Sequence, residues 1–338
     1  MTTVLVTAAG APGAARLLRA LRENGERDVR LVGVDMSEDA IGRHLCDAFH
    51  RVPAGSEPEY ADALLEIVER EGVDVVLPES SHDLPHLSAR RNEFPVPVLV
   101  SGPETVRRSN DKAEFYALLH EIGVPAPAFR RVSGAADVDA AARELGYPDK
   151  PVCFKPVYSS GSRGFRILDP TVDRAHQLLY ERPGALAMRL EEAVELLPDD
   201  GVDLLVMELA TGGERTIDGI GDGKRVVLGQ AKTREAMRAG LAMYFVTLES
   251  PELDEIAERI VSALEIEWFF NIQLVGDYVI EVNPRISTIV YQEDLNLPWL
   301  AVKRALGEVS DDELASMHSR VRPGRTALRF FDQVEFDA

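Results

Sequence analysis

Residues 271–285 carry side chains whose types and spacing suit metal and phosphate chemistry. Gln273 lies on one expected strand, and Glu281 and Asn283 lie two residues apart on the next, which puts them on one strand face. Carboxylate and amide oxygens are ligands that Mg²⁺ prefers, and the ion is usually shared with nucleotide phosphates. Arg285 lies two residues further on, and the segment is therefore predicted to bind Mg²⁺ and a phosphoryl group together. A polar edge strand that ends in an Asn-Pro turn is the simpler alternative.

A second candidate site lies upstream, where an apolar expected strand contains a single lysine, Lys155. The strand leads into a loop of small residues and then into another short strand, the pattern of a hairpin with a Gly- and Ser-rich tip. Backbone N–H groups and hydroxyls at such a tip can close over phosphate oxygens. The predicted phosphate contacts are Ser160, Gly161 and Ser162. A hairpin without chemistry is the alternative, and Lys155 favours the phosphate site.

Lysine is scarce in this chain, with six lysines among 37 basic residues. A lysine inside an apolar strand needs an anionic partner, because an unpaired buried charge carries a large desolvation cost. Lys155 is one such residue. Lys112, which opens an expected helix after Asp111, is the second. Both lysines are therefore predicted to bind an anion.

In chain order, these segments resemble the ATP-grasp superfamily, and in particular the carboxylate–amine ligases related to the large subunit of carbamoyl phosphate synthetase. The resemblance covers nearly the whole chain, and five motifs in the family's order support one another as context. The motifs are Asn110-Asp111-Lys112 with Gly123-Val124-Pro125-Ala126-Pro127, Lys155 with the loop 159–164, Met207-Glu208-Leu209 with Gly213-Glu214, Asn271-Ile272-Gln273, and Glu281-Val282-Asn283-Pro284-Arg285.

The resemblance implies an α/β protein with the α+β ATP-grasp fold. A Rossmann-like domain is expected over residues 1–107, followed by a two-lobed ATP-grasp module. Its entry helix and small lid subdomain are expected over 108–207, and its C-terminal lobe with the metal site over 208–338. The helical stretch 169–203 is longer than the lid is expected to need and has no assigned role.

The resemblance also implies how ATP binds. Lys112 and Lys155 would neutralise its α- and β-phosphates under the Gly/Ser loop. Glu208 and Leu209 would face the adenine, and Glu214 would contact the ribose.

Gln273, Glu281 and Asn283 would hold one or two Mg²⁺ ions, with Mn²⁺ as an alternative. Arg285 would neutralise the transferring phosphoryl group, and Arg238 would face the acceptor carboxylate and its acyl phosphate. These two arginines are the predicted catalytic residues.

Arg238 is chosen from three basic residues, with Lys232 and Arg234, expected in a loop between two strand-like runs. In ligases that the chain resembles, basic residues of the corresponding loop face the acceptor. The planar fork of arginine suits a carboxylate, and Arg238 adjoins Ala239-Gly240. A charged connector without a role is the alternative.

These assignments predict an enzyme, an ADP-forming carbon–nitrogen ligase. It would activate a carboxylate as an acyl phosphate and join it to an amine as an amide or peptide bond, with amino acids as the expected substrates. Positioning and electrostatics carry such phosphoryl transfer. The alternatives are a non-catalytic or regulatory nucleotide-binding protein on the same fold, and the carboxyphosphate chemistry of biotin carboxylase or carbamoyl phosphate synthetase.

The bulk composition narrows the partners. A formal net charge of −20 argues against a nucleic-acid partner, and it fits either halophilic adaptation or solubility. No apolar run reaches membrane-spanning length, so no membrane association is expected. Two distant cysteines and the absence of a signal sequence predict a cytoplasmic protein. A homodimer stays open.

The first hundred residues alternate between expected strands and helices, which implies a parallel sheet covered by helices. This creates a rival hypothesis, a dinucleotide site built from the turn at Gly10 and Gly13 and from Asp35 after the second strand. The turn reads Gly-x-x-Gly rather than Gly-x-Gly-x-x-Gly, so its glycines are wrongly spaced for the pyrophosphate.

The loop 78–83 follows the carboxyl end of an expected strand, where ligands of open α/β sheets bind. Ser80 and Ser81 are expected to cap the next helix, whose N-terminus favours an anion such as a substrate carboxylate. Capping alone is the alternative to ligand contact. His82 is expected to be a surface residue.

Overall fold

The computed structural model describes residues 1–159, 161–181, 184, 186–238, 241–286, 295–330 and 332–336, without the side chains of 237, 238 and 241. The chain forms two compact units. Unit 1 comprises residues 1–107, 214–273 and 282–338, and unit 2 comprises 108–213 and 274–281. The three predicted segments divide the chain differently after the shared boundary at residue 107, because the chain returns to unit 2 for residues 274–281.

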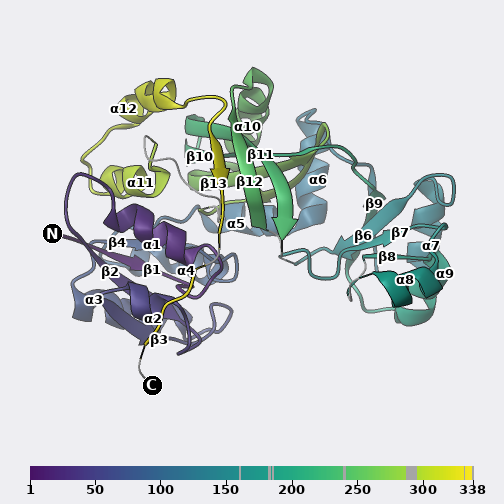
Figure 1. Ribbon diagram of the computed structural model, residues 1–338, viewed down its shortest axis with the longest axis horizontal. Coiled ribbons are helices and arrows are strands. Elements are labelled where there is room, and N and C mark those ends of the chain that lie inside the picture. The colour runs from purple at the N-terminus through teal and green to yellow at the C-terminus, as the bar shows by residue number, and fades with distance from the viewer. Residues whose placement is uncertain are drawn as a thin grey trace. The chain divides into compact units, whose positions relative to one another are not determined.

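Unit 1 begins with a four-stranded parallel sheet in the order β3-β2-β1-β4 (Figure 1). Its strands are β1 (Thr2–Val6), β2 (Val29–Asp35), β3 (Ala48–Arg51) and β4 (Val75–Leu77). Its connecting helices are α1 (Ala14–Arg22), α2 (Gly42–Leu45), α3 (Tyr60–Glu71) and α4 (Leu84–Arg90), with the 3₁₀ turn η1 (Arg91–Glu93) after α4. Residues 2–6 are buried on both strand faces, as expected for a parallel strand covered by helices. The predicted strand–helix alternation is confirmed.

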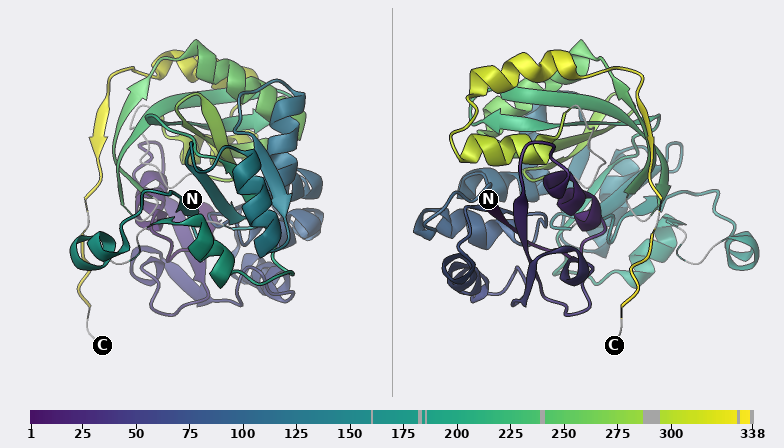
Figure 2. Two further views of the ribbon diagram at one scale, coloured as in Figure 1. Left: turned by 90° about the vertical axis from the view of Figure 1, so that its right-hand side faces the viewer. Right: turned by 60° about the vertical axis from the view of Figure 1, so that its left-hand side comes forward.

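A six-stranded sheet in the order β14-β13-β10-β11-β12-β15 follows. Its strands are β10 (Glu214–Asp222), β11 (Val226–Arg238), β12 (Leu241–Leu248), β13 (Glu267–Val275), β14 (Tyr278–Asn283) and β15 (Thr326–Leu328). Helices α10 (Pro251–Leu264), α11 (Leu297–Ala305) and α12 (Asp311–Ser316), and the 3₁₀ turn η2 (Met317–Arg320), complete this region. Strand β15, the yellow arrow in Figure 2, pairs with β12 at the edge of the sheet.

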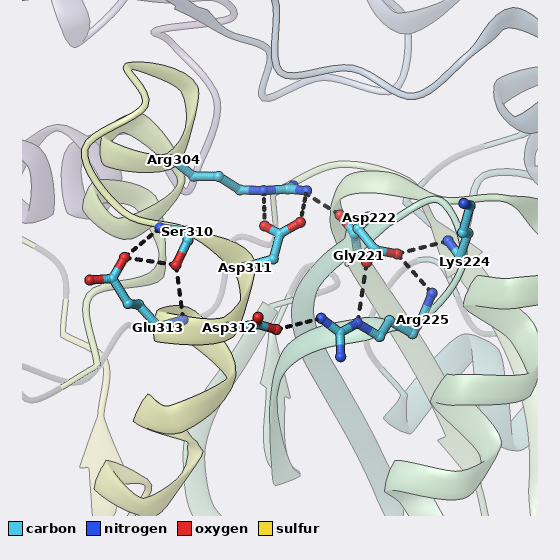
Figure 3. Close-up of polar contacts among 9 residues, drawn as sticks. All are labelled: Gly221, Asp222, Lys224, Arg225, Arg304, Ser310, Asp311, Asp312 and Glu313. Carbon is cyan, nitrogen blue, oxygen red and sulfur yellow. Dashed lines mark hydrogen bonds and ion pairs between the residues drawn. The ribbon is translucent and has the colours of Figure 1, made fainter.

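The C-terminal helices are tied to the β10–β11 hairpin by ion pairs (Figure 3). Arg304 at the end of α11 donates to both carboxylate oxygens of Asp311 and, at 3.0 Å, to the carbonyl of Gly221. Arg225 pairs with Asp312 at 3.0 Å. Ser310 caps α12 in a reciprocal capping box with Glu313. These contacts hold α11 and α12 against the sheet that carries Gln273 and Asn283.

One hydrophobic core joins the two sheets of unit 1. It contains Leu17 and Leu21 of α1, Phe269 of β13 and Trp299 of α11, all at most 2% exposed. Burying side chains of this size contributes roughly 1.5–3 kcal/mol each. The shared core makes the loop after β4 and the end of β14 parts of the same unit.

Unit 2 contains a five-stranded sheet in the order β5-β9-β6-β7-β8. Its strands are β5 (Phe129–Val132), β6 (Val152–Pro156), β7 (Arg166–Leu168), β8 (Ala187–Met188) and β9 (Leu204–Glu208). Its helices are α6 (Lys112–Glu121), α7 (Ala135–Glu144), α8 (Arg174–Tyr180) and α9 (Leu190–Leu196), and α5 (Pro103–Asn110) leads into it. Strands β6 and β7 pair antiparallel, which confirms the predicted hairpin.

Candidate nucleotide and metal site

Lys112 is placed by the cap of its own helix. The carboxylate of Asp111 accepts hydrogen bonds from the backbone N–H groups of Ala113 and Glu114, both at 3.0 Å, and so starts α6 at Lys112. The lysine is 8% exposed. Its Nζ donates to the carbonyl of Ser159 at 2.6 Å and to that of Val157 at 3.3 Å. Lys112 therefore contacts the backbone that leads into the Gly/Ser loop.

Lys155 reaches the same part of unit 2 from β6. Its Nζ donates to the hydroxyl of Tyr116 at 3.2 Å and to the carbonyl of Ile280 at 3.4 Å. It also lies 5.2 Å from the centroid of the Tyr116 ring, within reach of a cation–π contact. Among the described residues, no carboxylate forms an ion pair with Lys112 or Lys155. Both ammonium groups are held by neutral oxygens.

Burial perturbs both lysines in one direction. It lowers the pKa of Lys155 to about 8, and Lys112 nearby lowers it further, while the charge of Glu281 opposes the shift. Burial also lowers the pKa of Lys112, against Glu281 and Asp111. A desolvated cation without a paired anion is stabilised by an incoming anion. The chemistry of these donors therefore fits phosphate oxygens.

The loop between β6 and β7 has the backbone that the prediction requires. Gly161, Ser162 and Gly164 have φ values of 63°, 59° and 74°, in the left-handed region that favours glycine. A Cβ added to Gly164 would approach the Pro156 ring to 2.6 Å, so glycine is needed there. Gly161 and Ser162 are exposed, whereas Ser160 lies outside the described residues. The phosphate contacts of this loop stay a prediction.

The predicted adenosine contacts fall on two elements. Glu208 ends β9, and its Oε2 accepts a hydrogen bond from the backbone N–H of Ala128 at 3.1 Å. Leu209 follows and is partly exposed. Glu214 begins β10, where its carboxylate lies 3.7 Å from Arg234. The carboxylate of Glu208 thus already accepts a hydrogen bond from the protein backbone. The chain then continues through Leu209 to β10.

Gln273 and Asn283 meet around a third amide, that of Asn271. The Oδ1 of Asn271 accepts from Nε2 of Gln273 at 2.8 Å and from Nδ2 of Asn283 at 3.4 Å. Its Nδ2 donates to Thr216 at 2.7 Å and to Asp218 at 2.8 Å. Both predicted amide ligands are therefore oriented by a buried residue that the sequence motif contained but to which no role was assigned.

Glu281 lies two residues before Asn283 on β14 and belongs to unit 2 with the two lysines. Within the described part of the chain, no three His, Cys, Asp or Glu side chains are grouped to hold a metal ion. A metal at the predicted ligands would therefore depend on the amide oxygens of Gln273 and Asn283. In the present arrangement, Oε1 of Gln273 accepts a hydrogen bond from Arg234.

A buried ion pair supports this amide cluster from behind. Lys232 is 0% exposed, and its Nζ lies 3.4 Å from Oδ2 of Asp218, the carboxylate that also binds Asn271. Burial lowers the pKa of Lys232, and Asp218 opposes that shift. Sequence reasoning missed this pair. The signal was available in Thr216 and Asp218, which lie two residues apart and therefore share one face of the strand.

The expected loop for Lys232, Arg234 and Arg238 is wrong, because β11 continues through all three residues. Strand β11 pairs with β10 and β12 on both sides, and Lys232 and Arg234, two residues apart, lie on the same sheet face. Arg238 is the last residue of the strand, and its side chain lies outside the described part of the structure.

Arg285 contacts the loop after β4. Its Nε donates to the hydroxyl of Ser81 at 2.8 Å, and its Nη1 donates to the carbonyl of Ile286 at 2.8 Å. The predicted capping of α4 is wrong, because its N-cap is Asp83 without a side-chain cap hydrogen bond. Ser80 instead accepts from the backbone N–H of His82 at 3.1 Å. The serines are thus used within the loop and by Arg285.

Asp35, the residue of the rival dinucleotide site, serves its own turn. Its Oδ2 accepts a hydrogen bond from the backbone N–H of Gly10 at 2.8 Å, and its Oδ1 accepts from Ser37 at 2.9 Å. A Cβ on Gly10 would lie 2.9 Å from that same carboxylate. The close approach of the turn to the Asp35 carboxylate explains why residue 10 is a glycine, so no dinucleotide ribose is needed to account for either residue.

Two family models match this chain. Residues 200–326 match a family described as "ATP-grasp in the biosynthetic pathway with Ter operon", and residues 4–99 match the "PylC-like, N-terminal domain". The described residues contain no helix that is both long and apolar enough to span a membrane.

Solved structures with the same fold cover almost the whole chain. An L-amino acid ligase from Bacillus licheniformis is 18% identical with a TM-score of 0.66, over 96% of this chain and 78% of that one. A biotin carboxylase from Campylobacter jejuni, in a beta-gamma-ATP complex, is 17% identical with a TM-score of 0.67, over 96% and 74%. An N5-carboxyaminoimidazole synthetase from Staphylococcus aureus, complexed with ADP, is 13% identical with a TM-score of 0.59, over 97% and 80%.

These findings confirm the predicted fold: the chain has the ATP-grasp fold of the α/β class, residues 200–326 match an ATP-grasp family model, and residues 4–99 match a PylC-like N-terminal domain.

Proposed function

We propose that this protein is an ATP-dependent, ADP-forming ligase that activates a carboxylate as an acyl phosphate and joins it to an amine. The observation that carries the proposal is the pair Lys112 and Lys155 in unit 2. Lys112 is buried and Lys155 is half-buried, and the described partners of both ammonium groups are neutral oxygens. A structural lysine would have been paired with a carboxylate, whereas a phosphate-binding lysine has to keep its charge available for the ligand.

The phosphates of the nucleotide would bind in unit 2. Lys112 and Lys155 would contact these phosphates. The loop with Gly161 and Ser162 would donate N–H groups to the phosphate oxygens, and its closure would exclude water. The segment at Leu209 would offer backbone groups to the adenine. Glu208 and Glu214 are the proposed carboxylates for the adenosine.

Gln273, Glu281 and Asn283 are the proposed ligands of Mg²⁺, as one or two ions, or of Mn²⁺. Hard oxygen donors suit these ions, and the cluster around Asn271 already orients two of the three side chains. When bound, the metal supplies positive charge that neutralises the phosphate oxygens. Because Oε1 of Gln273 accepts from Arg234, this arginine has to release or share that oxygen for Gln273 to serve as a ligand.

Arg285 and Arg238 are the proposed contacts of the reacting carboxylate. A guanidinium binds a carboxylate or an acyl phosphate through paired N–H donors. The carboxylate oxygen attacks the γ-phosphorus and ADP leaves, and the amine nitrogen then attacks the acyl carbon and phosphate leaves. The protein supplies charge and alignment, and no protein nucleophile takes part.

Amino acids are the proposed substrates, because small zwitterions present both reacting groups, and the fold is similar to that of an L-amino acid ligase. Carboxyphosphate chemistry is the second candidate, favoured by the similarity to a biotin carboxylase and to N5-carboxyaminoimidazole synthetase. We further propose a cytoplasmic enzyme that acts on small molecules, with a homodimer as the first assembly to test.

The test is a phosphate-release screen with ATP, Mg²⁺ and pairs of amino acids, with products identified by mass. Release of ADP together with a product whose mass is that of the two amino acids together less one water supports the ligase. Bicarbonate-dependent release with no need for an amino acid would instead support carboxyphosphate chemistry. Lys155→Met should strongly reduce the signal at subsaturating ATP, and Lys150→Met, at an exposed lysine, is the matched control.

A further inference from the structure

Glu79 is a buried carboxylate without a described hydrogen-bond donor. It follows β4 in unit 1 and is 3% exposed, yet neither of its side-chain oxygens has a partner among the described residues. Its backbone is fixed, because its N–H donates to the hydroxyl of Thr7 at 3.1 Å. Buried polar groups are nearly always paired, since an unpaired one costs its full desolvation. The unpaired carboxylate of Glu79 therefore indicates that a hydrogen-bond donor from a ligand belongs beside it.

Asp83, four residues later in the same loop, shows what a satisfied carboxylate looks like here. It is 4% exposed, and its Oδ2 accepts from the hydroxyl of Thr7 at 2.5 Å. Thr7 thus serves both residues, but it gives its hydroxyl proton to Asp83. Glu79 is left with two free acceptor oxygens in the same environment.

The charges around Glu79 come from several elements of unit 1. Burial raises the pKa of Glu79 to about 8; Arg285 and Arg329 favour its ionised form, whereas Asp83 and Asp35 oppose it. Burial also raises the pKa of Asp83 to about 6, and Tyr60 faces Asp83. The cation that Glu79 lacks is therefore not supplied by a direct ion pair among the described residues.

The neighbouring guanidinium is already positioned for another task. Arg285 donates to Ser81, two residues after Glu79, and to the carbonyl of Ile286. The loop after β4 consequently brings an unpaired acceptor and an arginine into one neighbourhood. An amino acid carries complementary groups, an ammonium with three donors and a carboxylate with acceptors.

We propose that Glu79 receives the ammonium group of an amino-acid substrate, whose carboxylate or acyl phosphate contacts Arg285. The inference rests on the proposed ligase function and specifies which part of the substrate unit 1 recognises. A substrate that lacks the ammonium group leaves Glu79 unpaired and binds more weakly. Arg285 folding onto Glu79 is the competing arrangement, and it would make the pair structural.

A proton should leave when the substrate binds. At neutral pH the isolated Glu79 side chain holds a proton, and an ammonium beside it favours the carboxylate form. The proton passes to the buffer, and no covalent bond changes. A purely structural Glu79 would release no proton in response to a ligand.

The experiment uses the full chain at pH 7 and compares L-amino acids with their des-amino acids, beginning with L-alanine and propionate and continuing through the twenty common amino acids. Calorimetry in Pipes and in Tris buffer measures both affinity and proton release. The amino acid is expected to bind roughly ten- to a hundredfold more tightly than its des-amino acid, the range for a charged hydrogen bond, and to release a proton. Equal affinity for both in every pair would overturn the inference.

Glu79→Gln should reduce amino-acid affinity to that of the des-amino acid and stop the proton release, while Glu69→Gln, an exposed glutamate of α3, should do neither. Loss of affinity for both ligands alike would indicate a structural role and would contradict the proposal. The wild-type proton release needs no variant, so it decides the matter even if Glu79→Gln folds poorly. Amide formation that is indifferent to Glu79 would refute this inference alone, whereas Glu79-dependent binding without amide formation would refute the ligase.

Discussion

Two groups of lysines that are withdrawn from solvent differ in how their charge is balanced. Lys232 in unit 1 is paired with Asp218 and linked through it to Asn271. Lys112 and Lys155 in unit 2 contact carbonyl and hydroxyl oxygens and have no described carboxylate partner. The fold balances the charge of Lys232 with Asp218, whereas we propose that a bound anion balances the charges of Lys112 and Lys155. Burial of a lysine therefore does not by itself separate a structural role from a proposed ligand-binding role. The presence or absence of a carboxylate partner separates them.

The largest expected effect concerns Glu281, whose charge opposes the lowered pKa values of both unit 2 lysines. Glu281→Gln keeps the volume but removes the charge of a proposed metal ligand. Turnover should fall by more than about a hundredfold, the scale for losing one preorganised electrostatic contact. The measurement is ADP formation at ordinary Mg²⁺, with the melting temperature as a control for folding. Wild-type turnover would remove Glu281 from the metal site.

Lys232→Met and Lys155→Met test the comparison directly. Lys232→Met leaves Asp218 buried without its cation and should destabilise the fold by about 3–5 kcal/mol. Lys155→Met removes no ion pair, so it should preserve stability but weaken ATP binding roughly ten- to a hundredfold. Urea denaturation and ATP calorimetry on both variants give the two readouts.

The control is the double variant Asp218→Asn with Lys232→Met, which removes both charges and should recover part of the lost stability. If Lys155→Met unfolds the protein as readily as Lys232→Met does, the distinction between paired and unpaired lysines fails.

The two arginines proposed at the acceptor should separate in kinetics. Arg238→Ala should raise the KM for the carboxylate with little change in ATP affinity, since loss of uniform binding acts on KM. Arg285→Ala should mainly lower kcat, because its charge is needed most during phosphoryl transfer. Each change should be on the order of 1.5–3 kcal/mol. An Arg285→Ala protein that melts earlier but keeps its rate per folded molecule would make Arg285 a structural residue.

The pH dependence of stability should show Lys155 and Glu79 with opposite signs. The pKa of Lys155 is about 8 when folded against 10.5 for the free group, so the unfolded state holds more protons and stability rises with pH across that window. The pKa of Glu79 is about 8 against 4.5, so the folded state holds the proton and stability falls as pH rises from 4.5 to 8. Urea denaturation of wild type, Lys155→Met and Glu79→Gln across pH 4.5–10.5 should show each slope disappear with its residue.

The smallest effect is expected for Asp35→Ala. Its carboxylate accepts from Gly10 and Ser37 in its own turn, so ATP binding and turnover should be unchanged, and stability should fall by about 1 kcal/mol, as for a lost turn or cap hydrogen bond. Calorimetry with NAD(P) should show no binding. Binding that depends on Asp35 would restore the dinucleotide hypothesis.

Local patterns in the sequence predicted the elements that carry the lysines. The Gly/Ser tip between two β-rich runs predicted the β6–β7 hairpin, because such residues permit the positive φ values seen at Gly161 and Gly164. The helix expected to open at Lys112 is α6, and the structure shows that the carboxylate of Asp111 caps its first N–H groups. The fold class followed from five such motifs in order.

Tertiary structure alone decided what each polar residue touches. Strand β11 runs through Arg234 and Arg238 although a loop was expected, because pairing with β10 and β12 satisfies its backbone on both sides. Asn271 became the centre of the amide cluster through residues 53 and 55 positions away in the chain. The spacing of residues along a strand predicts on which face of the sheet a side chain lies. It does not predict which residue of another strand that side chain contacts. The sequence therefore determined the fold and the chemical types at the site, whereas only the folded chain distinguished paired from unpaired buried charges.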